Sequence, residues 1–194
     1  MHKLDRAFYE RPTLEVARDI LGKYFVYESP EGRLAARIVE VEAYIGEDDP
    51  ARHASAGLTE RTRPMFGPGG FTYVYFIYGM YHCLNLVTEK KGSPAALLVR
   101  AGEPADGYDV MRGPASGKDR NSLLAGPGKF CRAMGLTRSH NNLDLIGPVA
   151  YVEDRGSTVK KLKQTPRVGI STAKERPWRF VDADSPALSR KLDR

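Results

Sequence analysis

Apolar residues recur at helical spacing near the start of the chain, between Thr13 and Leu21. The apolar positions in this stretch are Leu14, Ala17, Ile20 and Leu21. Intervals of three and four residues place such side chains on one face of a helix. Pro12 precedes the stretch and Gly22 follows it, as is typical of helix ends. The pattern predicts a short amphipathic helix that packs on a sheet.

Two runs rich in Val, Ile and Tyr follow, over residues 23–28 and 33–43, with a Ser-Pro-Glu-Gly turn between them. This arrangement predicts a β-hairpin. Successive side chains of a strand point to opposite faces. The positions expected on one face of the second strand are Ile38, Glu40, Glu42 and Tyr44, and those expected on the other are Val39, Val41 and Ala43. Two carboxylates are therefore expected to share a face with an aromatic ring.

A second hairpin is predicted over residues 71–87, after a long irregular connection at residues 45–70. Gly79 supplies the positive φ that its tight turn needs. Four of the ten tyrosines fall within nine residues here, at Tyr73, Tyr75, Tyr78 and Tyr81. Tyrosine rings can fill a sheet core or stack on nucleic-acid bases, so the pattern alone leaves both interpretations open.

The rest of the chain mixes short strands and helices without a regular βαβ alternation. The predicted elements are a strand at 96–100, a helix through 108–111, a helix opened by Gly126-Pro127-Gly128-Lys129, and strands near 150–152, 168–171 and 178–181. This order predicts an α+β fold, with a curved, mostly antiparallel β-sheet flanked by short helices and a protruding hairpin. The 194 residues favour one compact domain, residues 1–194.

Composition agrees with a globular chain, at 41% apolar and 28% charged residues. Two cysteines without a C-x-x-C pair favour neither a disulfide framework nor a cysteine zinc site, and we expect no metal and no cofactor. Residues 64–88 carry no charge, but four tyrosines and a glycine-rich start argue against a membrane span. The charged N-terminal residues do not resemble a signal peptide, so a cytoplasmic protein is expected.

The candidate chemistry lies on the second strand, where Glu40 and Glu42 are the best general-base candidates. Most strand glutamates are merely solvated or ion-paired. Tyr44 beside Glu42, the long connection after it and His53 within that connection favour Glu42. Zinc motifs, phosphate-binding loops and the G-x-S-x-G serine motif are absent from the sequence. Nucleotide hydrolysis and acyl transfer are therefore disfavoured.

Taken together, these motifs resemble those of the alkyladenine (3-methyladenine) DNA glycosylases, monofunctional enzymes that excise purines. The matching segments are Arg37-Ile38-Val39-Glu40-Val41-Glu42-Ala43-Tyr44, His53, Met65-Phe66, Tyr73-Val74-Tyr75-Phe76-Ile77-Tyr78-Gly79-Met80-Tyr81, Asn85, Leu97-Leu98-Val99-Arg100-Ala101, Gly126-Pro127-Gly128-Lys129 and Arg167-Val168-Gly169. They occur in family order from about residue 10 to 180, which is nearly the whole chain.

The resemblance implies a catalytic group of three residues. Glu42 would deprotonate a water that attacks C1′ of an extruded nucleotide, and Arg100 would help to hold that water. The carbonyl of Val168 would be a further ligand of the same water. No lysine lies among the matched pocket positions to form a Schiff base, so hydrolysis without strand cleavage is expected.

The resemblance also implies a pocket for the base and a surface for DNA. Tyr44 and His53 would stack on one face of the purine and Tyr75 on the other, while Asn85 would exclude the 2-amino group of guanine. Tyr78 would fill the gap in the duplex from the minor groove. The further residues expected to border the DNA are Thr59, Met65, Met80, Tyr81 and Lys129.

The implied partner is double-stranded DNA that contains damaged purines such as 3-methyladenine, 7-methylguanine, hypoxanthine or ethenoadenine. A monomer without an obligate protein partner would suffice, acting at the nucleoid in a prokaryote. Two alternatives stay open: a non-catalytic module that binds damaged DNA, and a hydrolase of free nucleosides. Strong salt dependence of binding would favour a duplex partner.

The net charge of +6 is unevenly distributed. Residues 1–97 carry 12 basic and 13 acidic side chains, whereas residues 98–194 carry 18 and 11. The basic excess is densest at residues 112–138 and 155–179. We therefore expect the second half of the chain to contact phosphates and the first half to hold the chemistry.

Overall fold

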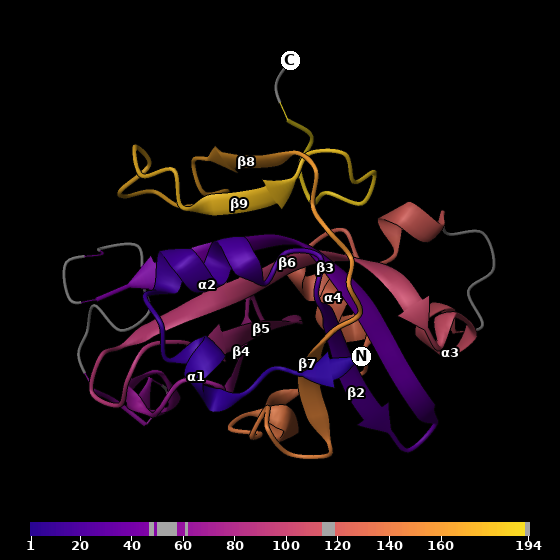
Figure 1. Ribbon diagram of the computed structural model, residues 1–194, viewed down its shortest axis with the longest axis horizontal. Helices are drawn as coiled ribbons and strands as arrows, with labels where there is room; N and C mark the ends of the chain where they lie inside the picture. The colour runs from indigo at the N-terminus through magenta and orange to yellow at the C-terminus, as the bar shows by residue number, and fades with distance from the viewer. Residues whose placement is uncertain (47–48, 50–57, 61, 114–118, 193–194) are drawn as a thin grey trace.

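Antiparallel pairing joins all the strands in the part of the chain that the computed structural model describes, residues 1–46, 49, 58–60, 62–113 and 119–192 (Figure 1). The nine strands there are β1 (His2–Lys3), β2 (Tyr24–Ser29), β3 (Gly32–Ile45), β4 (Thr72–Ile77), β5 (Tyr81–Val87), β6 (Ala95–Asp106), β7 (Ala150–Asp154), β8 (Leu162–Thr165) and β9 (Arg179–Asp182). Their order is β1-β7-β2-β3-β6-β5-β4, with β9 added to β3 and β8 to β9. The α+β prediction with a mostly antiparallel sheet is confirmed.

The long strand β3 organises the sheet. One of its edges pairs with β6, while the other pairs first with β2 and then, at residues 40–42, with β9. A β-bulge interrupts the pairing with β6 around Val39. Ile38 consequently packs in the main core, whereas Val39 packs against Ala101 and Ala187. The predicted alternation is therefore wrong at Ile38 and Val39, because a bulge inserts one residue and changes the facing of the next.

Short helices cover the sheet. The helices are α1 (Arg6–Tyr9), α2 (Thr13–Asp19), α3 (Tyr108–Arg112) and α4 (Pro127–Ala133), with 3₁₀ turns η2 (Arg63–Phe66), η3 (Arg120–Ser122) and η4 (Arg138–His140). From α2, Val16 and Ala17 enter the main core, so the predicted amphipathic helix is confirmed. From α4, Phe130 enters the same core and meets Phe25 of β2 edge to face, with ring centroids 6.0 Å apart. Burial of these apolar faces fixes the helices on the sheet.

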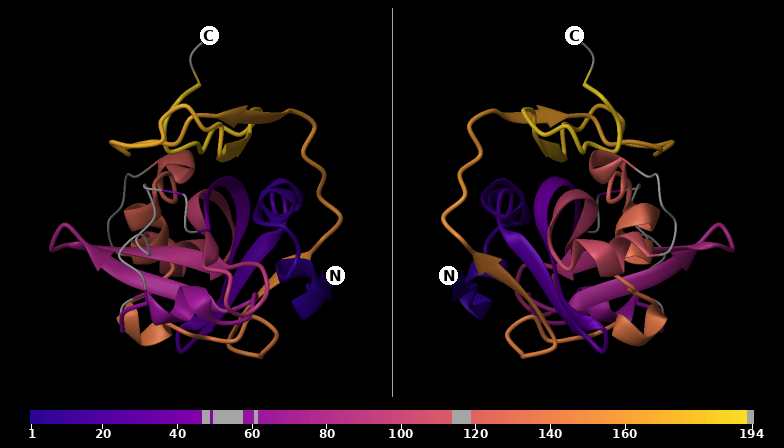
Figure 2. Two further views of the ribbon diagram at one scale, coloured as in Figure 1. Left: turned by 90° about the vertical axis from the view of Figure 1, so that its left-hand side faces the viewer. Right: turned by 90° about the vertical axis from the view of Figure 1, so that its right-hand side faces the viewer.

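The hairpin of β4 and β5 extends away from the rest of the molecule, as the magenta strands show in Figure 2. Its turn is tight, with φ of 54° at Tyr78 and 67° at Gly79, and the Met80 N–H donates to the Ile77 carbonyl at 3.3 Å. Positive φ at both central residues matches the turn type that suits a two-residue hairpin loop. Tyr78 is 79% exposed at the tip. The structure confirms the predicted role of Gly79.

The predicted strand at residues 168–171 is wrong. The chain is extended earlier, in β8, and it bends at Val168 and Gly169, where Gly169 has a φ of 75°. The Val168 N–H donates to a side-chain carboxylate of β3 and not to a strand ladder. This bend brings the segment into a cavity beside β3.

None of the helices in the described residues is long and apolar enough to cross a membrane.

Candidate active site

A cavity of about 620 Å³ lies between the hairpin, the centre of the sheet and the start of α4. Its walls come from β3, β4, β5, β6, the first residues of α4 and the segment after β8. The lining residues singled out from the sequence are Tyr44, Met65, Tyr75, Tyr78, Tyr81, Asn85, Arg100, Lys129 and Val168. Fold and sequence therefore bring residues from widely separated segments to one site.

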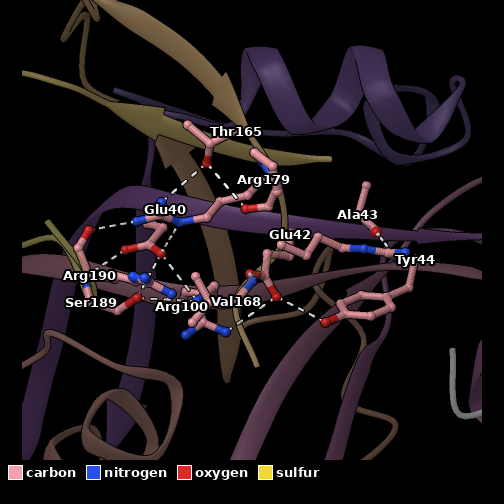
Figure 3. Close-up of polar contacts among 12 residues, drawn as sticks. Glu40, Glu42, Ala43, Tyr44, Arg100, Thr165, Val168, Arg179, Ser189 and Arg190 are labelled. Atoms are coloured by element: carbon pink, nitrogen blue, oxygen red, sulfur yellow. Dashed lines mark hydrogen bonds and ion pairs between the residues drawn. The ribbon is translucent and has the colours of Figure 1, made fainter. Parts of the chain in front are cut away.

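Glu42 lies directly behind three of these lining residues and is completely buried. Its Oε2 accepts a hydrogen bond from the Tyr44 hydroxyl at 2.9 Å and one from Arg100 Nη1 at 3.2 Å. Its Oε1 accepts a hydrogen bond from the Val168 N–H at 2.7 Å (Figure 3). Each of these donors favours the ionised form of the carboxylate.

Burial nevertheless raises the pKa of Glu42 above its ordinary value, and burial is the largest effect. The charge of Arg100 and the hydrogen bonds from Val168 and Tyr44 lower this pKa, while the nearby charge of Glu40 raises it. A carboxylate with a raised pKa is a stronger base than a solvated glutamate. The partners of Glu42 thus favour its ionised form, while burial makes that form more basic.

Glu40, the other general-base candidate, is held differently. It is completely buried, and its Oε1 accepts hydrogen bonds from Arg100 Nε at 3.1 Å and from Arg179 Nε at 2.7 Å. Its Oε2 accepts a hydrogen bond from the Ser189 N–H at 2.6 Å. Glu40 does not line the cavity. The geometry therefore selects Glu42 as the carboxylate next to the cavity.

Arg167 supports the ring of Tyr44. Its guanidinium lies 4.7 Å from the Tyr44 ring centre and 5.2 Å from that of Trp178. Its Nη2 donates to Asp49 Oδ1 at 2.8 Å, and its Nη1 donates to the Ala43 carbonyl at 2.9 Å. The ion pair between Arg167 and Asp49 is fully buried. Arg167 is therefore fixed in place and holds the backbone of β3 at Ala43 and the ring of Tyr44 in one position.

The opposite wall is formed by the hairpin. Tyr75 stands opposite Cys83 in the strand register. Burial raises the pKa of the Tyr75 phenol, which stays neutral. The amide of Asn85 is fixed because its Nδ2 donates to the Tyr73 carbonyl at 3.0 Å. This wall is rigid and mostly apolar, with one oriented amide.

Two of the predicted residues lie away from the cavity, and a third is not among the described residues. Met80 is 65% exposed near the hairpin tip, outside the cavity. Thr59 is exposed and bonds to Thr62 in its own turn, with 2.8 Å from its N–H to Thr62 Oγ1. His53 lies outside the described residues. The structure thus neither supports nor contradicts a stacking role for His53.

Sequence reasoning missed several lining or supporting residues. Cys83, Leu98 and residues 169–172 line the cavity, and Asp49 and Arg179 hold its supporting side chains. The two-residue period of β5 and β6 could have indicated Cys83 and Leu98. Each lies two positions from another cavity-lining residue of its strand and therefore points to the same face. The segment after β8 carries no comparable periodicity.

Only part of the basic excess reaches the surface. Arg167 and Arg179 are buried and paired with carboxylates, and Arg155 is paired with Glu153 and Asp106. Within the basic stretch at residues 155–179, these three arginines therefore bind carboxylates of the protein itself. Exposed basic side chains include Lys129, Arg132, Arg138, Lys160, Lys161, Lys163 and Lys174.

The chain belongs to the methylpurine-DNA glycosylase family, whose sequence model matches residues 7–186. A protein of Methanocella arvoryzae is 54% identical over 98% of both chains. A protein of Alkaliphilus oremlandii is 47% identical, over 97% of this chain and 100% of its own length. Both carry the provisional name of 3-methyladenine DNA glycosylase. The resemblance inferred from the motifs is confirmed.

Proposed function

We propose that this protein excises damaged purines from duplex DNA by hydrolysing the N-glycosidic bond, with Glu42 as the general base. One observation carries the proposal: a buried carboxylate held by three donors directly behind a cavity lined with aromatic rings. The cavity volume of about 620 Å³ lies within the usual range for small-molecule sites. A flat purine extruded from the duplex fits this combination of rings and base.

The reaction needs a water between the carboxylate and C1′ of the extruded nucleotide. Glu42 Oε1 accepts one hydrogen bond, from Val168, and an ionised carboxylate oxygen can accept a second, from the water. Arg100 and the Val168 carbonyl would orient the same water. As Glu42 takes its proton, the water oxygen bonds to C1′, the bond from C1′ to the base breaks, and its electron pair leaves with the base.

Base recognition would rely on stacking and one oriented amide. In this proposal Tyr44 and His53 contact one face of the purine, and Tyr75 contacts the other. Alkylated purines such as 3-methyladenine and 7-methylguanine carry positive charge, which aromatic faces attract. Hypoxanthine and ethenoadenine would bind by stacking alone. Asn85, fixed by the Tyr73 carbonyl, would oppose the 2-amino group of normal guanine.

The hairpin would open the duplex. Extrusion of a base costs a few kcal/mol and leaves a gap that a side chain must fill. The exposed Tyr78 at the hairpin tip would enter the minor groove and occupy this gap. The residues that would border the DNA around it are Thr59, Met65, Met80, Tyr81 and Lys129. Exposed lysines and arginines beyond α4 would bind phosphates.

The whole chain, residues 1–194, would act as one glycosylase domain and as a monomer, at the nucleoid in the cytoplasm. It would need no protein partner and no cofactor. Its product would be an abasic site on an intact strand, because the pocket positions matched to the family include no lysine that could form a Schiff base. Lys129, which lines the cavity, is among the residues proposed to border the DNA.

The test uses duplexes that contain one hypoxanthine or one 7-methylguanine, under single-turnover conditions. Chromatography measures the released base, and strand integrity is measured before and after alkali. We expect base release with strand breaks only after alkali. Breaks without alkali would contradict hydrolysis alone, and binding without release would leave only a DNA-binding module. Equal release from free deoxyinosine would favour a nucleoside hydrolase.

A further inference from the structure

The second buried carboxylate, Glu40, is bound by the end of the chain. Ser189 donates its N–H to Glu40 Oε2 at 2.6 Å and its hydroxyl to Glu40 Oε1 at 2.7 Å. Arg179 Nη2 donates to the Arg190 carbonyl at 2.8 Å. The C-terminal segment, residues 187–190, thus closes over the charged cluster beside the cavity (Figure 3).

Arg100 connects this cluster to Glu42. Its Nε donates to Glu40 at 3.1 Å and to Ser189 Oγ at 3.2 Å, while its Nη1 donates to Glu42 Oε2 at 3.2 Å. A guanidinium is planar, so anchoring Nε also fixes the direction of Nη1. The contact between Arg100 and Glu42 therefore depends on Glu40 and Ser189.

Neither Glu40 nor Ser189 lines the cavity, so they have no direct route to a bound base. Glu40 is shared between two arginines, Arg100 and Arg179. With Glu42, these four groups form a buried cluster of two positive and two negative charges. A neutral cluster of this kind keeps its geometry only while each charge has its partner.

We propose that Glu40 and Ser189 are positioning residues of the reaction: they hold Arg100 in the orientation that stabilises the Glu42 carboxylate. The C-terminal segment thereby becomes part of the catalytic apparatus, although 149 residues separate Glu40 from Ser189. This inference rests on the proposed function, because it concerns the base of that reaction.

The expected effect is a shift in the titration of Glu42. The groups that face Glu42 are Arg100 from β6, Tyr44 and Glu40 from β3, and the Val168 N–H after β8, with Arg167 farther off. Of these, Ser189 holds Arg100 and Glu40, and of these two residues Arg100 is the one that hydrogen-bonds to the Glu42 carboxylate. Loosening Arg100 weakens its stabilisation of the carboxylate, so the pKa of Glu42 rises while base stacking is untouched.

Three variants test whether Ser189 controls the titration of Glu42. Ser189→Ala removes the hydroxyl that contacts both Glu40 and Arg100, and Ser189→Thr restores it. Ser185→Ala is the matched control, because the Ser185 hydroxyl donates at 2.6 Å to Glu103, outside the cluster. Thermal unfolding confirms that each variant is folded.

Two measurements are made on each variant. Carboxyl-carbon NMR titrates Glu42 without DNA, and its signal is identified by its loss in Glu42→Gln. Single-turnover base release gives the pH–rate profile. We expect Ser189→Ala to raise the pKa of Glu42 by about 0.5–1 unit and to move the acid limb of the profile equally. Ser189→Thr and Ser185→Ala should match the wild type.

An unchanged Glu42 titration in Ser189→Ala would overturn the inference. An equal shift in Ser185→Ala, or no rescue by Ser189→Thr, would also overturn it, because either result would indicate general loosening of the C-terminal segment. If the wild type releases no base, the proposed function fails, while the NMR titration still decides whether Ser189 controls Glu42.

Discussion

Tyr44→Phe separates the two roles of Tyr44, which are to present a ring to the cavity and to donate a hydrogen bond to Glu42. The substitution keeps the aromatic ring on the cavity wall and removes the hydroxyl that donates to Glu42 Oε2 at 2.9 Å. Glu42 is completely buried, so water does not freely replace the lost donor. The variant therefore changes the environment of the carboxylate and leaves the stacking surface in place.

The size of the effect follows from the charge on the acceptor. A hydrogen bond to a charged group contributes about 1.5–3 kcal/mol, and one pKa unit corresponds to roughly 1.4 kcal/mol. The Tyr44 hydroxyl lowers the pKa of Glu42, so its loss should raise that pKa by about 1–2 units. At a pH below the wild-type pKa, the rate should fall by about 10- to 100-fold. Well above the raised pKa, the rate should approach that of the wild type.

The assay is single-turnover release of hypoxanthine from duplex DNA across the acid to neutral range. The wild-type acid limb should already lie above the ordinary glutamate range, because burial raises the pKa of Glu42. The matched control is Tyr151→Phe, which removes a hydroxyl that donates at 2.7 Å to Glu28, away from the cavity. An unshifted acid limb, or a rate loss of equal size at every pH, would refute the reasoning.

Three further predictions concern the hairpin, α4 and the sheet. Tyr78→Ala should weaken binding to damaged duplex by about tenfold or more and leave thermal stability unchanged, since Tyr78 is 79% exposed; lost stability with unchanged affinity would indicate a structural role instead. Gly128→Ala should displace Tyr81, because the new Cβ would lie 2.7 Å from its Cδ1, so unfolding and duplex-binding measurements that both match the wild type would contradict this packing. Lys23 forms an ion pair with Asp154 at 2.6 Å, so Lys23→Met should lower the free energy of unfolding by about 1 kcal/mol or less. Denaturant titrations should show that this loss vanishes as pH falls through the lowered pKa of Asp154. A loss that persists in acid would show that the ion pair is not its cause.

Local patterns predicted the hairpins well. The limits of β5 and the positive φ at Gly79 follow from residues adjacent in sequence. The amphipathic α2 likewise depends on its own spacing. Turn chemistry and periodicity act over a few residues, so these features could be predicted without knowledge of the rest of the fold.

Long-range contacts explain what the sequence did not predict. The bulge at Val39 occurs where β3 stops pairing with β2 and begins to pair with β9, which lies about 140 residues later in the sequence. Two of the partners of Glu40, Arg179 and Ser189, have no sequence spacing that links them to it. The segment at Val168 is apolar enough for a strand, but its N–H serves Glu42 instead. Such choices are made by tertiary structure, which overrides local preference.

The candidate site was predicted through its motifs and not through its geometry. The tyrosine hairpin and the strand of Glu42 indicated part of the cavity lining, including Tyr44, Tyr75 and Asn85. Arg167 lay within a matched motif, but its position behind Tyr44 became evident only from the structure. Alternation placed Glu40 and Glu42 on one face and could not show which carboxylate is adjacent to the cavity.

The central claim, that Glu42 is the base that activates water, is tested most directly by Glu42→Gln. The variant keeps the side-chain volume and removes the proton acceptor. Glu28→Gln is the matched control, since Glu28 also accepts a tyrosine hydroxyl but lies away from the cavity. We predict that Glu42→Gln binds damaged duplex as the wild type does and releases base about 100-fold or more slowly in single-turnover reactions, while Glu28→Gln is unaffected. Base release by Glu42→Gln at the wild-type rate would contradict the account.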